Sequence, residues 1–353
     1  MTTLKYYFSL FALLLMISCE EKVATPEIGI TTESDTYQVG TPVRFNIEGN
    51  ADMISFYSGE PTNDYSFRDG RTIDVSNGTV TLAFTSAVTG GAQTDQLRLL
   101  ASTDFDGNYD NLASVQAATW TDITSRFTFG TSATFLTSTV QNVTDLLVPG
   151  KPLYFAFRYV TKPQATNGLA RTWMIQSFAL KSSVMFNNAE VTITDQANAG
   201  FRIVDQEPVN APSRSTITTS RISLLGNFYK DPADPIFDPA NPIYDPANPI
   251  YDRQSPLYNP NAVRPEFVAY DPNSPYNDPQ TETWAVSKPI MVDEVNLGPD
   301  WSRSIKGIAN PKLEQFQHTY LTPGTYTAHF IAINATIDGR EETIKEISLT
   351  ITE

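Results

Sequence analysis

The sequence predicts an all-β protein built of sandwiches. Short runs rich in β-branched and aromatic residues, such as VRFNIEG (43–49) and LYFAFRYV (153–160), alternate along the chain with turns rich in Gly, Asn, Asp and Pro. Long stretches with the periodicity of an amphipathic helix are hard to find. With 41% hydrophobic and 11% aromatic residues, the 353-residue chain can bury one or two ordinary cores.

The N-terminus is typical of an export signal that ends at a lipid-attachment cysteine. Its apolar run (6–17) follows one lysine and is shorter than the roughly 20 residues of a membrane-spanning helix, which indicates a signal peptide of residues 1–18. The segment MISC (16–19) resembles the lipobox of bacterial lipoproteins, in which the cysteine sulfur is diacylated and cleavage follows. We therefore expect Cys19, the one cysteine of the chain, to be the lipidated mature N-terminus. The alternatives are an ordinary secretory signal and a buried free thiol.

The residues after the cysteine bear on location. The two or three acyl chains of a bacterial lipoprotein anchor it stably, so contact with the membrane through the lipid anchor alone is expected. Glu20-Glu21-Lys22 resembles the acidic signal that sends Bacteroidota lipoproteins to the outer face of the outer membrane. We expect a lipid-anchored protein of the outer membrane, displayed at the cell surface, with residues 19–25 as a tether; two acidic residues are equally consistent with a solvated tether alone.

The charge excludes one class of partner. The formal net charge is −15, and removing residues 1–18 takes away one lysine and no acidic residue, which leaves −16. Such a surface repels phosphate backbones and lacks the basic stripe that counterion release requires, so no nucleic-acid partner is expected. Neutral glycans and cations remain compatible with it.

The C-terminal region carries a family resemblance. The segment HTYLTPGTYTAHF (318–330) joins a Pro-Gly turn to an alternating strand and resembles the end of a PKD-like immunoglobulin domain. The early strands of such a domain fall in residues 26–58. The resemblance thus implies a discontinuous sandwich of residues 26–58 plus 306–353, interrupted by an inserted domain of residues 59–305. A long insertion at a loop tip is tolerated because loop-closure entropy grows only logarithmically with length.

The insertion has strand-like runs of its own, spaced as in a jelly roll. The runs are TVTLAFTS (79–86), QLRLLASTDF (96–105), ATWTDIT (118–124), LYFAFRYV (153–160) and TWMIQSFALKSS (172–183). They resemble the jelly-roll modules of cleaved adhesins and choice-of-anchor proteins, and the mature chain as a whole resembles a domain-of-unknown-function family of Bacteroidota lipoproteins often encoded beside SusC/SusD-like glycan importers. The resemblance implies a non-catalytic glycan-binding accessory whose partners are a polysaccharide or oligosaccharide and the importer.

A seven-residue repeat, DPANPIY and its variants, interrupts the insertion at residues 231–261. Two prolines in most repeats prevent a regular helix and a central strand, because each proline lacks an N–H donor and has a fixed φ. We expect extended, polyproline-like turns on the surface that act as a spacer. A ribbon that contacts a ligand is the alternative.

No catalytic motif is evident. The two histidines, His318 and His329, have no acid or nucleophile at a meaningful spacing, so we assign them structural roles and expect no enzyme. A glycoside hydrolase with two distant carboxylates is an alternative. A second alternative is an adhesive or scaffolding protein that binds another protein.

An acidic segment, DFDGNYDN, is a candidate for a structural Ca²⁺ site because oxygen ligands alternate along it. It is not an EF-hand, since Gly107 is fourth and Val115 twelfth in the segment. Turn chemistry explains the same residues and is the favoured interpretation, and no other cofactor is expected. The candidate ligands are Asp104, Asp106, Asn108 and Asp110.

Aromatic rings are the candidates for glycan binding, because sugars stack on exposed rings while polar side chains bond their hydroxyls. Trp120 and Trp173 occur in strand-like runs, which favours packing. We expect Trp301, in LGPDWSRS, and Tyr109, in the acidic segment, to be more exposed, with Tyr65 as a third candidate.

Overall fold

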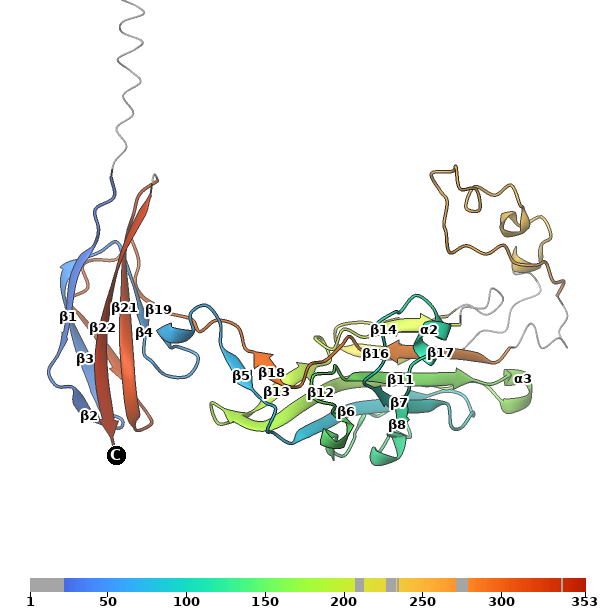
Figure 1. The fold of residues 1–353 in the computed structure, drawn as a ribbon, viewed down its shortest axis with the longest axis horizontal. Helices are drawn as coiled ribbons and strands as arrows, with labels where there is room; N and C mark the ends of the chain where they lie inside the picture. Colours follow the sequence, from blue (N-terminus) through green and yellow to red (C-terminus); the bar gives the residue numbers. More distant parts are fainter. Residues whose placement is uncertain (1–21, 207–212, 227–232, 234, 271–278, 338) are drawn as a thin grey trace, which may run out of the picture. The chain divides into compact units, whose positions relative to one another are not determined.

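The computed structural model describes residues 22–206, 213–226, 233, 235–270, 279–337 and 339–353 (Figure 1). The predicted all-β sandwich fold is confirmed, since five β-sheets account for most of the regular structure. Cys19 and the predicted signal peptide lie outside these residues. Among the described helices, none has the length and apolar character needed to cross a membrane.

The chain divides into two compact units. Unit 2 is Asp74–Val295, and unit 1 combines the described residues before it with Asn296–Glu353. Unit 1 therefore also includes residues 59–73 and 296–305, which the sequence assigned to the insertion. Contacts between these two segments account for the difference: the Leu297 N–H donates to the Arg71 carbonyl, and the Arg71 N–H donates to the Gly298 carbonyl.

Unit 1 is a sandwich of a three-stranded and a five-stranded sheet. The strand orders are β1-β3-β20 and β19-β4-β21-β22-β2, and only the β2–β22 pair is parallel. The strands are β1 (Glu27–Thr32), β2 (Thr36–Gln38), β3 (Pro42–Asn50), β4 (Met53–Tyr57), β19 (Arg303–Lys306), β20 (Gln315–Thr319), β21 (Gly324–Ala335) and β22 (Arg340–Thr352).

Aromatic side chains form the core of unit 1. The rings of Phe45, Phe56 and Phe330 pack with centroids 5.0 to 5.6 Å apart, and all three are fully buried. Tyr326, Ala328 and Phe330 alternate along β21 and point into this core, as the period-two pattern of a half-buried strand requires. Each buried phenylalanine contributes about 2 kcal/mol by removing its ring from water.

Unit 2 is a second sandwich. One sheet has the order β10-β6-β12-β16-β15, with β13 also paired to β12 and β9 to β6, and the other has the order β14-β17-β11-β7-β8. The strands are β6 (Val80–Thr89), β7 (Leu97–Ser102), β8 (Thr121–Asp122), β9 (Leu136–Thr137), β10 (Gln141–Asn142), β11 (Tyr154–Thr161), β12 (Thr172–Phe186), β13 (Ala189–Asp195), β14 (Arg202–Asp205), β15 (Thr216–Ile217), β16 (Arg221–Leu224) and β17 (Thr281–Val286). The short β5 (Thr72–Asp74) and β18 (Glu294–Asn296) form a two-stranded sheet.

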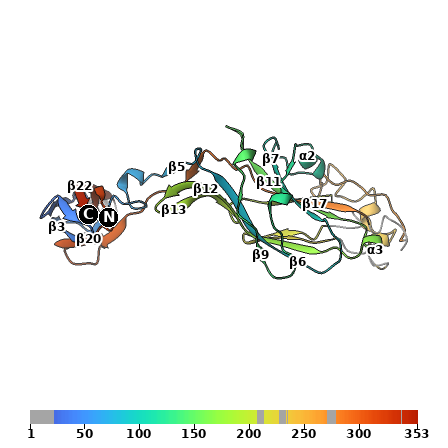
Figure 2. The same cartoon turned by 90° about the horizontal axis from the view of Figure 1, so that it is seen from below.

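Both faces of the second sheet of unit 2 are covered. Its inner face packs against the first sheet through side chains such as Phe157 against Phe84. Its outer face carries a separate cluster beneath helix α2 (Leu112–Gln116), which Figure 2 shows on the side away from β6 and β9. All six residues of β17 are consequently buried. The other helices are short: α3 (Gln164–Asn167) and the 3₁₀ turns Tyr65–Phe67, Thr124–Arg126, Thr144–Leu146, Pro235–Phe237 and Pro242–Tyr244.

The seven-residue repeat folds into a coil rather than the expected extended turns. Asparagine and tyrosine side chains of one repeat donate hydrogen bonds to carbonyls of the preceding repeat: Asn248 Nδ2 to Pro242 at 2.8 Å, and the Tyr251 hydroxyl to Ile243 at 2.7 Å. Asn241 and Tyr244 repeat the arrangement one turn earlier. Pro242 fits because it starts a helical turn, where no N–H is needed, after Asn241, whose side chain caps the turn.

A return segment covers the coil. The rings of Phe237 and Tyr270 lie 5.0 Å apart, those of Tyr244 and Phe267 lie 5.3 Å apart, and the Arg264 guanidinium donates to the Tyr244 carbonyl. The tyrosines are therefore half-buried within the repeat itself, which argues against a freely exposed aromatic ribbon.

We predict that the coil tolerates loss of a whole repeat but not of part of one. Deleting residues 245–251 preserves the spacing of the Asn and Tyr bonds, so the free energy of unfolding should change by no more than about 0.5 kcal/mol, and the coil should resist limited proteolysis. Deleting residues 245–248 shifts that spacing and should open the coil to cleavage within residues 235–270. Equal protease resistance of both variants would contradict the described bonding.

Candidate functional site

The segment between β4 and β5, residues 58–71, folds into a compact loop on unit 1, here called the 58–71 loop. Its first turn is closed by two backbone bonds, from Gly59 N–H to the Asn63 carbonyl and from Asn63 N–H to the Glu60 carbonyl. Thr62, between them, has φ of +71°, a left-handed conformation that a β-branched residue rarely adopts. Asp64 then caps the short helical turn by accepting the Ser66 N–H at 2.9 Å.

A buried ion pair holds this loop to the segment before β19. Arg71 Nε and Nη2 donate to the two carboxylate oxygens of Asp300 at 3.0 and 2.6 Å, and the two residues are only 8% and 4% exposed. The guanidinium also lies 3.5 Å from the centre of the Phe67 ring. Burial alone raises the pKa of Asp300, but the hydrogen bonds from Arg71 and the Asp64 N–H more than offset it and hold the pKa below its usual value.

Trp301 follows this ion pair and is fixed at its backbone but free at its ring. Its N–H donates to the Thr62 carbonyl at 3.2 Å, and its carbonyl accepts from the Asn63 side chain. Its side chain is nevertheless left in solvent, since the residue is 73% exposed. The structure therefore presents an indole ring on a backbone that the 58–71 loop holds from two sides.

Tyr65 occupies the same loop but is enclosed. Its ring stacks on His329 at 4.5 Å, meets the edge of Tyr57 at 5.5 Å and lies beneath the Arg68 guanidinium at 4.3 Å. Tyr65 is half-buried, and its ring packs the loop against Tyr57 and His329. Of the three predicted aromatic candidates, Tyr65 thus lies on the 58–71 loop and Trp301 on the segment whose backbone is bonded to that loop.

Both histidines contact this loop from the strands beneath it. His318 Nε2 lies 2.7 Å from Glu60 Oε2, and its ring packs between Phe56 and Tyr320. The hydrogen bond with His318 holds the pKa of Glu60 below its usual value against the opposing effect of burial. No local pattern predicts this pair, because the two residues are 258 positions apart.

A buried tyrosine completes the support of the loop. The Tyr320 hydroxyl donates to the Ser58 carbonyl at 2.9 Å, and burial raises the pKa of Tyr320, so this hydroxyl stays a donor at neutral pH. His329 is 3.4 Å from Glu346 and stacks on Tyr65 from β21. Both histidines, to which the sequence analysis assigned structural roles, thus contact and support the 58–71 loop.

Tyr109 belongs to unit 2, whereas Tyr65 and Trp301 belong to unit 1. Its hydroxyl donates to the Ser287 carbonyl at 2.8 Å, its ring meets Phe105 edge-on, and the Arg202 guanidinium lies 4.8 Å from its centre. Burial raises the pKa of Tyr109. The residue is half-buried instead of exposed, because its segment folds over the outer face of the second sheet.

The acidic segment forms successive turns. Asp106 Oδ1 accepts the Asn108 N–H and Asn108 Oδ1 accepts the Asp110 N–H, both at 2.9 Å, which is the turn chemistry favoured from the sequence. Asp104 instead accepts from the Ser102 hydroxyl and the Thr119 N–H. Within the described part of the chain, no group of three or more His, Cys, Asp or Glu side chains is arranged to hold a metal ion.

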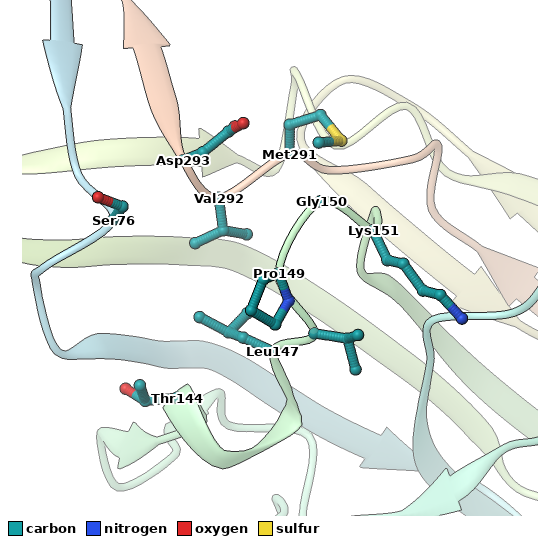
Figure 3. A pocket seen from close by; sticks show the side chains of 10 residues that line it. Ser76, Thr144, Leu147, Pro149, Gly150, Lys151, Met291, Val292 and Asp293 are labelled. Atoms are coloured by element: carbon teal, nitrogen blue, oxygen red, sulfur yellow. The ribbon is translucent and has the colours of Figure 1, made fainter.

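Unit 2 has a pocket of about 310 Å³ between its 144–151 segment and the segment before β18 (Figure 3). Its wall is mostly apolar, and Figure 3 shows Pro149 and Val292 facing each other across it, with Ser76 and Asp293 at one side and Lys151 extending away at the other. The lining residues are Ser76, Thr144, Leu147, Val148, Pro149, Gly150, Lys151, Met291, Val292 and Asp293.

The Glu60–His318 pair generates a pH-dependent prediction. The pKa of Glu60 is lowered in the folded state, so its contribution to stability is present above about pH 4.5 and is lost as the pH falls through its folded pKa. Glu60→Gln should therefore reduce the free energy of unfolding by about 1 kcal/mol at neutral pH, and this difference should vanish in acid. Denaturant unfolding of both proteins between about pH 3 and 7 measures it.

Glu346→Gln is the matched control, because its more exposed carboxylate faces the other histidine at 3.4 Å. Its effect should be smaller at every pH. A Glu60→Gln difference that is constant down to the acid limit would contradict the assigned role.

Comparisons with known proteins identify a family but name no activity. Searches of curated proteins and of solved structures find no significant match to the chain. A family model described as a domain of unknown function, DUF5017, matches residues 18–201, which run from the predicted lipid-attachment region to the residue before β14 in unit 2. The match covers more than half of the sequence, and the chain therefore belongs to the DUF5017 family.

Proposed function

We propose that this protein is a non-catalytic glycan-binding protein, and that Trp301 is its main contact with sugar. The observation that carries the proposal is the combination of a 73% exposed indole with a backbone fixed by Thr62 and Asn63. A sugar ring that stacks on this indole orders only two side-chain torsions, so little of the binding free energy is lost to ordering the protein.

The wider assignment rests on the sequence. The lipobox-like segment and the resemblance to Bacteroidota lipoproteins imply lipid attachment at Cys19 and display at the outer-membrane surface. They also imply that the protein is an accessory of a SusC/SusD-like importer. The charge of the mature chain favours a neutral glycan over an anionic polymer. A structural Ca²⁺ in the acidic segment is part of the proposal only as an auxiliary, since Trp301 belongs to the other unit.

Affinity electrophoresis of residues 20–353 through gels that contain single polysaccharides tests this function, with calcium and with chelator. At least one neutral polysaccharide should retard the protein without release of sugar, and Trp301→Ala should weaken retardation about tenfold, whereas Trp301→Phe should retain most of it. Leu321→Ala is the matched control, because Leu321 is an equally exposed apolar residue of unit 1. Retardation that Trp301→Ala leaves unchanged would refute the assigned role of the indole.

A protein-binding adhesin or scaffold is the second candidate. Trp301 shares unit 1 with other exposed apolar side chains, Leu321 at 73% and Ile308 at 66% exposure, and tryptophan is enriched in the energetic centres of protein interfaces. No retardation by any glycan of a broad panel would favour this candidate.

The anchor has its own prediction. Cells that express the wild-type chain should incorporate labelled palmitate into it, and Cys19→Ala should abolish the label and release the protein from the membrane fraction, because no other cysteine can accept the lipid. An unlabelled wild-type protein would overturn the lipoprotein assignment.

A further inference from the structure

A second pocket of unit 2 has the chemistry of a polar ligand site. It has a volume of about 480 Å³ and lies where β7 ends, beside β8 and the two helical turns Thr124–Arg126 and Thr144–Leu146. Ala101 and Leu153 form part of its apolar floor, and both belong to the core of unit 2. Its volume falls within the roughly 300 to 1,000 Å³ that small-molecule sites occupy.

A carboxylate on the rim is fixed in place. Asp104 Oδ1 accepts the Ser102 hydroxyl at 2.8 Å and the Thr119 N–H at 2.9 Å. Hydrogen bonds from the side chains of Thr119 and then Ser102, with a smaller effect of the Thr119 N–H, hold the pKa of Asp104 below its usual value. The pocket lining therefore includes an ionised acceptor, on a residue that is itself exposed to solvent.

The lining of this pocket also includes a bidentate ion pair. Arg126 Nη1 and Nη2 donate to Asp145 Oδ1 and Oδ2, both at 2.7 Å, and the two helical turns that line the pocket supply these residues. The pairing fixes the planar guanidinium and the carboxylate in one geometry. Both groups retain capacity for further hydrogen bonds, because guanidinium has five donors and a carboxylate about four acceptor sites.

Lys151 is the free donor of the pocket. No hydrogen bond or ion pair joins its ammonium to another residue in the described ranges, and the side chain is exposed. Lys151 borders both pockets of this region, and Figure 3 shows its side chain extending away from the apolar pocket. We infer that the ammonium serves the polar pocket instead.

The charges on this pocket cancel, which identifies the class of ligand. Two cations, Arg126 and Lys151, face two anions, Asp104 and Asp145, so neither an anionic nor a cationic group gains on balance. A sugar hydroxyl both donates and accepts, and can satisfy carboxylates and cations together. We propose that this pocket binds one residue of a neutral hexopyranose.

This site is separate from Trp301, and it depends on the proposed function only for the choice of sugars as ligands. Monosaccharides cannot bridge two sites, so they report each site alone.

The test mixes residues 20–353 with millimolar D-glucose, D-galactose or D-mannose. Saturation-transfer NMR and calorimetry measure the binding of each sugar. At least one neutral hexose should bind, and Lys151→Met should weaken it about fivefold or more, while Lys151→Arg should restore most of the affinity because it keeps a cationic donor. Lys181→Met, at an exposed lysine of β12, is the control and should change nothing. Hexose binding should also survive Trp301→Ala.

The outcomes separate this inference from the proposed function. Absence of hexose binding, binding that Lys151→Met leaves intact, or binding of D-galacturonate or D-glucosamine in preference to the neutral sugars would overturn the assignment of this pocket. Loss of polysaccharide retardation in Trp301→Ala would still support the function proposed for unit 1. Conversely, hexose binding that depends on Lys151 would support the pocket even where Trp301→Ala retains full retardation.

Discussion

The site on unit 1 depends on the buried Arg71–Asp300 ion pair. Removing either partner would leave an uncompensated charge in the interior, which typically destabilises a protein by 3 to 5 kcal/mol. The pair also orders the residues around it. Asp300 accepts a hydrogen bond from the Asp64 N–H, and the Arg71 guanidinium lies over the Phe67 ring. The residue that follows Asp300 is Trp301. The exposed indole is thus held by an interaction that is itself shielded from solvent and weakly screened by salt.

The same pair explains how unit 1 tolerates a large insertion. Arg71 and Asp300 are 229 positions apart, and they flank the segments through which the chain leaves and re-enters unit 1. The entropy of closing so long a loop rises by only about 0.6 kcal/mol for each doubling of its length. The buried, bidentate pair lies where the insertion begins and ends. It therefore stabilises unit 1 whatever number of heptad repeats the insertion carries.

Alternation along the chain was enough to predict strands and fold class, because it records which face of a strand is buried. LYFAFRYV became β11 and TWMIQSFALKSS most of β12, but in ATWTDIT only two residues pair, since Trp120 packs beneath α2. Pairings such as Glu60 with His318 leave no local pattern. The prediction of extended turns for the repeat was wrong because the preferences of proline describe the backbone alone. The coil is closed by Asn and Tyr side chains, which donate hydrogen bonds to the preceding repeat.

The four tryptophans show why one of them is the stronger candidate for recognition. Trp284 is buried and Trp120 is half-buried, and their indole N–H groups donate to the Glu282 carboxylate and the Val115 carbonyl. Trp173 packs against the main core of unit 2. Trp301 differs in leaving both its ring face and its N–H to solvent while its backbone is fixed. Packing within the protein does not require such exposure. The exposed indole supplies the apolar face and the polar edge that a sugar ring needs.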